Sequence, residues 1–145
     1  MENRKAQAEG ALRNLEKDRQ AVDGIRAQIL EKTADMIHLT ELGYGQPDDP
    51  EGAPSPRMRV LMDKKRALEA KEKALTAHVK QVDRVLAAMG ERDVDILKEF
   101  YVVSQWRSRT AIVLCLCQRW NISRSEVYRQ RDEALWNFAY RMGWI

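Results

Sequence analysis

Apolar residues recur every seven positions through the first 42 residues, which predicts a helix that packs along one face. One row consists of Leu15, Val22, Ile29 and Met36. A companion row consists of Ala11, Ile25 and Leu39, interrupted by Asp18 and Lys32. No proline falls within this stretch. A single long amphipathic helix is therefore expected.

Segment 43–56 interrupts the pattern, because it contains all four prolines and three of the seven glycines of the chain. Neither a helix nor a strand continues through such a segment, so a surface loop is expected. The heptad spacing resumes at Leu61, Leu68, Leu75, Val82 and Met89. Folding the chain back at the loop pairs Leu39 with Leu61 and brings Glu72 near Lys32.

Residues 1–90 are thus predicted to form a long antiparallel helical hairpin, with Gly90 as a stop. Two helices bury only one seam and need further packing, so the hairpin is expected to serve assembly or partner docking. Residues 91–145 are predicted to form a second domain. It begins with a short helix through Val94, Leu97 and Tyr101, and continues with an apolar helix through 107–120. The predicted fold class is all-α.

A break at Trp120-Asn121-Ile122 divides the second domain in the manner of a helix-turn-helix. That motif requires a small residue where its helices approach, and Cys117 occupies the place. It requires a residue that tolerates left-handed backbone in the turn, and Asn121 occupies it. Apolar positions of the motif are filled by Leu116, Trp120, Ile122 and Val127. Ser123 and Glu126 have the spacing of a capping box that opens the next helix.

Charge is unevenly distributed along the chain, although the net charge is only +3. Residues 104–145 contain seven arginines and three acidic residues, which indicates a partner that carries phosphates. The start of the second motif helix presents Arg124, Ser125, Tyr128 and Arg129, with Arg131 one turn further. A recognition helix meets the major groove of DNA with this end. Arg107, Arg109 and Arg119 are expected to contact the DNA backbone, while base and phosphate contacts remain open for the others.

These residues resemble the DNA-binding region 4 of sigma-70-type factors. The matching positions are Glu91, Arg92, Leu97, Tyr101, Ile122, Ser123, Arg124, Val127, Ala134 and Leu135. The ending "EALWNFAYRMGWI" is similar to phage-encoded regulators of the ArpU and RinA type. Two features depart from the sigma pattern: the stretch from Tyr101 to Ser123 is longer, and Gln130 replaces an apolar residue. The resemblance implies a role in late transcription of phages of Gram-positive bacteria.

The leading functional hypothesis is a sequence-specific, DNA-binding transcriptional regulator encoded by a phage or prophage. Its expected partners are double-stranded DNA, a second copy bound through the hairpin, and RNA polymerase. The alternative is a DNA-packaging or assembly protein of the small terminase type, which also joins such a motif to helical oligomerisation segments. A dimer favours regulation, whereas a ring of many subunits favours packaging.

The sequence does not indicate a metal-binding protein, an enzyme or a membrane protein. Cys115 and Cys117 are two residues apart, so they point to different sides of a helix and are not expected to share a metal. No catalytic constellation or phosphate loop is found, and neither an enzyme nor a bound cofactor is expected. No apolar run is long enough for a membrane span and no signal peptide is visible, so a cytoplasmic location is expected.

Overall fold

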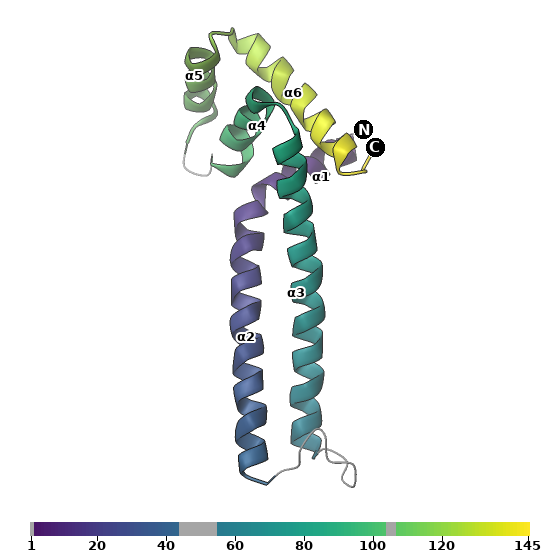
Figure 1. Cartoon of the computed structure of the whole chain (residues 1–145). Coiled ribbons are helices and arrows are strands. Elements are labelled where there is room, and N and C mark those ends of the chain that lie inside the picture. The colour runs from purple at the N-terminus through teal and green to yellow at the C-terminus, as the bar shows by residue number, and fades with distance from the viewer. Residues whose placement is uncertain (1, 44–54, 104–106) are drawn as a thin grey trace. The chain divides into compact units, whose positions relative to one another are not determined.

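The computed structural model describes residues 2–43, 55–103 and 107–145, and within these ranges the regular elements are all helices, confirming the all-α prediction (Figure 1). Most of the predicted loop 43–56 lies outside the described residues. The elements are α1 (Glu2–Arg13), α2 (Leu15–Glu41), α3 (Pro56–Ala88), α4 (Glu91–Leu97), the π-helix η1 (Lys98–Val102), α5 (Arg109–Trp120) and α6 (Arg124–Arg141).

Packing divides the chain into two compact units whose limits differ from the boundary drawn at residue 90. One unit combines Met1–Asp18 with His78–Ile145, and the other consists of Arg19–Ala77. The ends of α2 and α3 nearest the C-terminal helices thus belong to the same unit as those helices. In that unit Val82 and Leu86 of α3, with Met89 just after its end, share a buried cluster with α4 and α6 residues.

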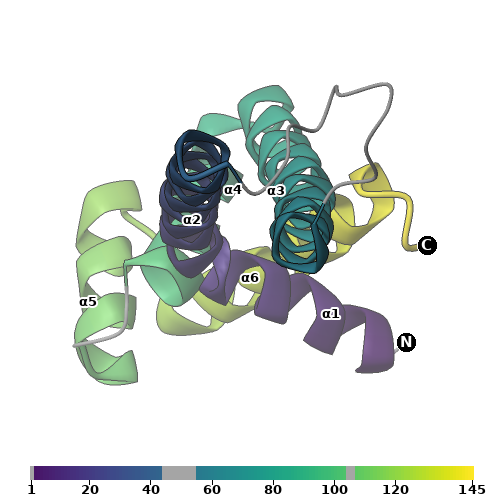
Figure 2. The same cartoon turned by 90° about the horizontal axis from the view of Figure 1, so that it is seen from below.

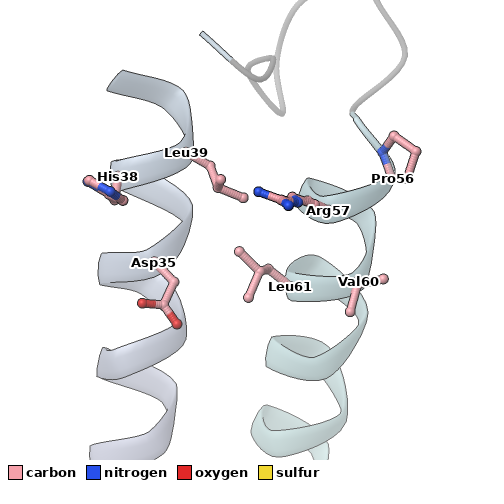
Figure 3. Close-up of a pocket in the computed structure, with 7 residues that line it drawn as sticks. All are labelled: Asp35, His38, Leu39, Pro56, Arg57, Val60 and Leu61. Carbon is pink, nitrogen blue, oxygen red and sulfur yellow. The ribbon is translucent and has the colours of Figure 1, made fainter. Parts of the chain in front are cut away.

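In the unit Arg19–Ala77, α2 and α3 lie side by side and antiparallel (Figures 1 and 2). The Arg26 Nε atom donates to Glu72 Oε1 at 2.9 Å. Toward the loop, Leu39 points across to Leu61, as the heptad pairing predicted (Figure 3). Glu72, expected near Lys32, therefore lies against a residue almost two turns earlier in α2.

The start of α3 is capped by its own sequence. The Ser55 hydroxyl accepts a hydrogen bond from the Met58 backbone amide at 3.1 Å, and Pro56 is the first helical residue. Proline suits this position because its missing N–H would have no partner there, and its fixed φ matches the helix. The loop therefore ends in a defined helix start.

The continuous helix predicted for 1–42 is broken at Asn14, which lies between α1 and α2. Hydrogen bonding continues across the break, since Asn14 N donates to Gly10 O at 3.0 Å and Asp18 N donates to Asn14 O at 2.7 Å. α1 packs against α6 and η1 (Figures 1 and 2). Ala8 and Leu12 are fully buried there, so α1 completes the core of the C-terminal helices.

Tyr101 of η1 also contacts α1, through Glu9 and Arg13. Tyr101 is 4% exposed, and the Arg13 guanidinium carbon lies 5.4 Å from the centre of its ring. The hydroxyl donates to Glu9 Oε1 at 3.5 Å. Burial, with the charge of Glu9, raises the pKa of Tyr101 to about 12. The folded structure therefore favours the protonated, uncharged form of the Tyr101 hydroxyl.

The packing of α1 predicts that Leu12→Ala destabilises the protein by about 2–5 kcal/mol, because the substitution leaves a cavity in a fully buried site. Leu114→Ala is the matched control, since Leu114 of α5 is 49% exposed and its replacement should cost well under half as much. Denaturant unfolding monitored by circular dichroism measures both. Equal effects of the two substitutions would contradict the burial of α1 in this core.

Candidate nucleic-acid interface

The turn between α5 and α6 is formed by Asn121 and Ile122, whose backbone amides both bond to the end of α5. Asn121 has φ 52° and ψ 53°, the left-handed conformation expected there, and its amide donates to Cys117 O. The Ile122 amide donates to the same carbonyl at 3.2 Å. These hydrogen bonds satisfy the end of α5, and the chain then reverses into Ser123. Asparagine adopts this backbone more easily than most non-glycine residues, because its side chain is short and polar.

The start of α6 is capped by Ser123, whose hydroxyl accepts from the Glu126 amide at 3.2 Å. The reciprocal half of the predicted capping box is wrong. Instead of returning to Ser123, the Glu126 carboxylate accepts from Arg129 Nε at 2.9 Å and from Gln130 Nε2 at 3.0 Å. These hydrogen bonds, led by that of Arg129, lower the pKa of Glu126 to about 2.

Apolar residues on both sides of the turn face the core. Leu116 and Val127 are fully buried, and Trp120 and Ile122 pack on the same cluster while partly exposed. Cys117 is also partly buried against this cluster, as a small residue at a helix contact should be. The predicted positions of the motif therefore come together in space.

Gln130, which departs from the sigma-like pattern, is held by Glu126 on one side only. Its Oε1 atom is buried and has no hydrogen-bond partner among the described residues. An unpaired buried acceptor costs stability, which an apolar side chain at this position would avoid. Gln130 thus gains a hydrogen bond to Glu126 through its Nε2 atom and leaves its Oε1 atom without a described partner.

Arg119 connects α5 to the helices before it. Its Nη1 atom lies 2.5 and 2.7 Å from the two Asp95 carboxylate oxygens, and both Nη atoms lie 3.2 Å from Glu99 Oε1. The Trp120 Nε1–H donates to Asp95 Oδ2 at 2.6 Å. Charge-assisted hydrogen bonds of this kind are the strong ones, so they hold α5 against α4 and η1. Arg119 thus has partners within the protein, while 40% of its side chain stays exposed.

Two further arginines expected at DNA also have internal partners. A hydrogen bond to Cys115 raises the pKa of Arg107, and so does its ion pair with Glu99. The Arg131 side chain is only 14% exposed, because its guanidinium lies over the rings of Phe100 and Tyr128. Tyr128 is accordingly half-buried. These residues contribute to the interior of the C-terminal helices.

The exposed remainder of the predicted site is at the start of α6. Arg124, Ser125 and Arg129 are exposed, and within the described ranges Arg124 forms no ion pair. Arg129 pairs with Glu126 and Glu133 on the helix surface. Arg109 is exposed as well, but it is the first residue of α5 and lies at the opposite end of that helix from the turn.

Sequence reasoning did not assign Arg92 to the site. Its guanidinium carbon lies 5.0 Å from the centre of the Trp120 ring, and its charge contributes to the lowered pKa of Glu126. Arg92 is exposed and thus adds positive charge beside the start of α6. Arg92 was among the residues that resemble the sigma-like pattern, but its place beside residues 120–126 depends on the tertiary structure.

Comparisons of the chain with models of protein families, with curated proteins and with solved structures found no match. Among the described helices, none combines the length and the apolar character that crossing a membrane requires. The same residues contain no group of three or more histidine, cysteine or acidic side chains placed to hold a metal ion.

The connection made by Asp95 predicts that Asp95→Ala lowers the free energy of unfolding by about 1–3 kcal/mol, because it removes the acceptor of Arg119 and Trp120. Asp93→Ala, two residues earlier in α4, is the control and should cost less than 1 kcal/mol, about the value of a favourable helix-dipole charge. Denaturant unfolding measures the free energy of unfolding of both variants. An unaffected Asp95→Ala protein would show that the hydrogen bonds do not hold α5.

Proposed function

We propose that the chain is a sequence-specific DNA-binding protein that inserts the start of α6 into the major groove. The observation that carries this proposal is the exposed helix start after a left-handed turn, with Arg124 and Ser125 outside and Val127 in the core. In helix-turn-helix proteins the corresponding end of the second helix contacts base edges. Arg124 has donors available for guanine or phosphate, because no ion pair within the described ranges occupies them.

Arg129 supports the proposal although it has partners. Its ion pairs with Glu126 and Glu133 are at the surface, where its side chain is 55% exposed. Exposed ion pairs contribute about 0–1 kcal/mol, so exchanging them for a DNA contact costs little. Asp132 and Glu133 lie one turn further along α6. Their charges repel phosphates, which confines the proposed contact to the first two turns.

Transcriptional regulation is the role that we propose for this DNA binding, on the sigma-like pattern of residues 91–135. In that pattern α4 and η1 support the helix-turn-helix, and the packing of α4 and η1 with α5 and α6 is compatible with it. A phage or prophage origin and a contact with RNA polymerase belong to the same proposal. They rest on the resemblance of the residues.

A second copy of the chain is the partner that we propose for the hairpin. In the unit Arg19–Ala77, Leu30, Ile37 and Val60 are 71%, 56% and 51% exposed. A cavity of about 520 Å³ opens between the helices beside Leu39 and Leu61 (Figure 3). The seam residues Leu61, Leu68 and Leu75 remain only half-buried. Pairing with another hairpin would remove this apolar surface from water.

The recognition proposal predicts that Arg124→Ala weakens specific DNA binding by about 1–3 kcal/mol through a lost base or phosphate contact. The DNA is first obtained by selecting bound duplexes from a random pool, and affinity is then measured by fluorescence anisotropy. Arg141→Ala is the control at the other end of α6, where Arg141 is exposed and donates to Asn137. Absence of an enriched sequence, or equal affinities of both variants, would contradict the proposed recognition helix.

The assembly proposal predicts that the wild-type chain is an oligomer and that the double substitution Leu30→Gln and Ile37→Gln reduces it to a monomer. Light scattering coupled to size-exclusion chromatography measures the mass. Leu114→Gln, at an exposed position of α5, should leave the mass unchanged. A dimer favours the regulator, whereas a large ring favours the packaging protein. A wild-type monomer at high concentration would contradict assembly through the hairpin.

A further inference from the structure

A cavity of about 430 Å³ lies within the unit formed by Met1–Asp18 and His78–Ile145, away from the turn between α5 and α6. Residues of α1, η1, α5 and α6 line it, together with Arg107 just before α5. Five of the lining side chains are cationic and one is acidic: Lys5, Arg13, Arg107, Arg109, Arg131 and Glu9. A cavity with this lining attracts an anion.

Three carboxylates neutralise part of this charge. Glu9 lies 3.6 Å from Arg13, and Asp132 lies 3.4 Å from Lys5 and 3.1 Å from Arg131. Glu99 forms the ion pair with Arg107. Five cations against these three carboxylates leave a surplus of two positive charges. A phosphate monoester carries roughly −1.5 to −2 at neutral pH, so one such group balances the surplus.

Three of the four arginines that line the cavity have partners before any ligand arrives. Arg131 lies 5.3 Å from the ring centre of Phe100, and Arg13 lies 5.4 Å from that of Tyr101. Arg107 is held by Glu99. Since an arginine has five N–H donors and a carboxylate takes at most two or three, donors remain for a ligand. Side chains that are already ordered lose little entropy on binding, which favours affinity.

We propose that this cavity binds a phosphate group, with Arg109 and Arg13 completing a site organised by Arg107 and Arg131. Arg109 is exposed and has no ion pair among the described residues, so its guanidinium is available to the ligand. The phosphate belongs either to a free small molecule or to the backbone of DNA. The site does not depend on the recognition role of α6, because Arg124 lies outside the cavity.

Titration of the full chain with inorganic phosphate, and separately with adenosine monophosphate, tests the site by isothermal calorimetry at constant ionic strength in chloride. We expect saturable binding with one site per chain. Arg109→Gln should weaken it roughly tenfold, the effect of losing about one charge-assisted hydrogen bond. Arg109 has no described ion pair to lose, so this variant should keep the wild-type melting temperature without phosphate.

Arg124→Gln is the matched control, because it removes the same charge from an exposed helix start outside the cavity. Unchanged phosphate affinity in this variant supports the site. A duplex from the DNA selection, or a random duplex if none is enriched, is then added as a competitor. Displacement of phosphate by the duplex, lost in Arg109→Gln, identifies backbone phosphate as the ligand. Phosphate or nucleotide binding that DNA does not displace identifies a free small molecule.

Two results would overturn the proposal. One is the absence of saturable binding of either phosphate compound above chloride at the same ionic strength. The other is an equal loss of affinity in Arg109→Gln and Arg124→Gln, which would mean that general surface charge attracts the anion. The proposed DNA recognition is tested separately, by the affinity of Arg124→Ala for the selected duplex. A failure of the phosphate site can therefore be distinguished from a failure of DNA recognition.

Discussion

The Asp95 carboxylate holds the arrangement on which the proposed interface depends. It accepts from the Arg119 guanidinium and from the Trp120 indole, both in the last turn of α5. Asn121 follows immediately and takes the left-handed conformation that reverses the chain. A shift of α5 would therefore move the turn and the start of α6 with it. Polar hydrogen bonds have directional preferences that apolar contacts lack, which suits them to fixing the direction of a helix end.

The N-terminal helix is the second condition for this arrangement. α4 and η1 are short, and a small set of helices buries a limited apolar surface. α1 adds Ala8 and Leu12 to their core. Tyr101 of η1 also contacts α1, through Glu9 and Arg13. The beginning of the chain thereby becomes part of the unit that contains its end. A fragment starting at residue 91 would expose this apolar surface to water.

The arginines of the C-terminal region differ in role although they are alike in sequence. Arg119, Arg107 and Arg131 pair with carboxylates or aromatic rings and stabilise helix contacts. Arg124 and Arg109 project into solvent from the first residues of α6 and α5. Guanidinium groups suit both roles, because they stay charged, stack on rings and donate several hydrogen bonds. The arginines of the segment thus divide between internal contacts and the two anion-binding surfaces that we propose.

The sequence by itself determined the helical content, the start of α3, the left-handed turn at Asn121 and the cap at Ser123. Each of these depends on residues a few positions apart, and local backbone preferences decide them. The break at Asn14 and the packing of α1 escaped the sequence, because the heptad row through Leu15 fits one long helix equally well. The partners of Arg119 and Arg131, and the cavity between α1 and α5, join residues distant along the chain. Only tertiary structure decided these, since a charged side chain takes the partner that folding brings nearest, and its neighbours in sequence do not identify that partner.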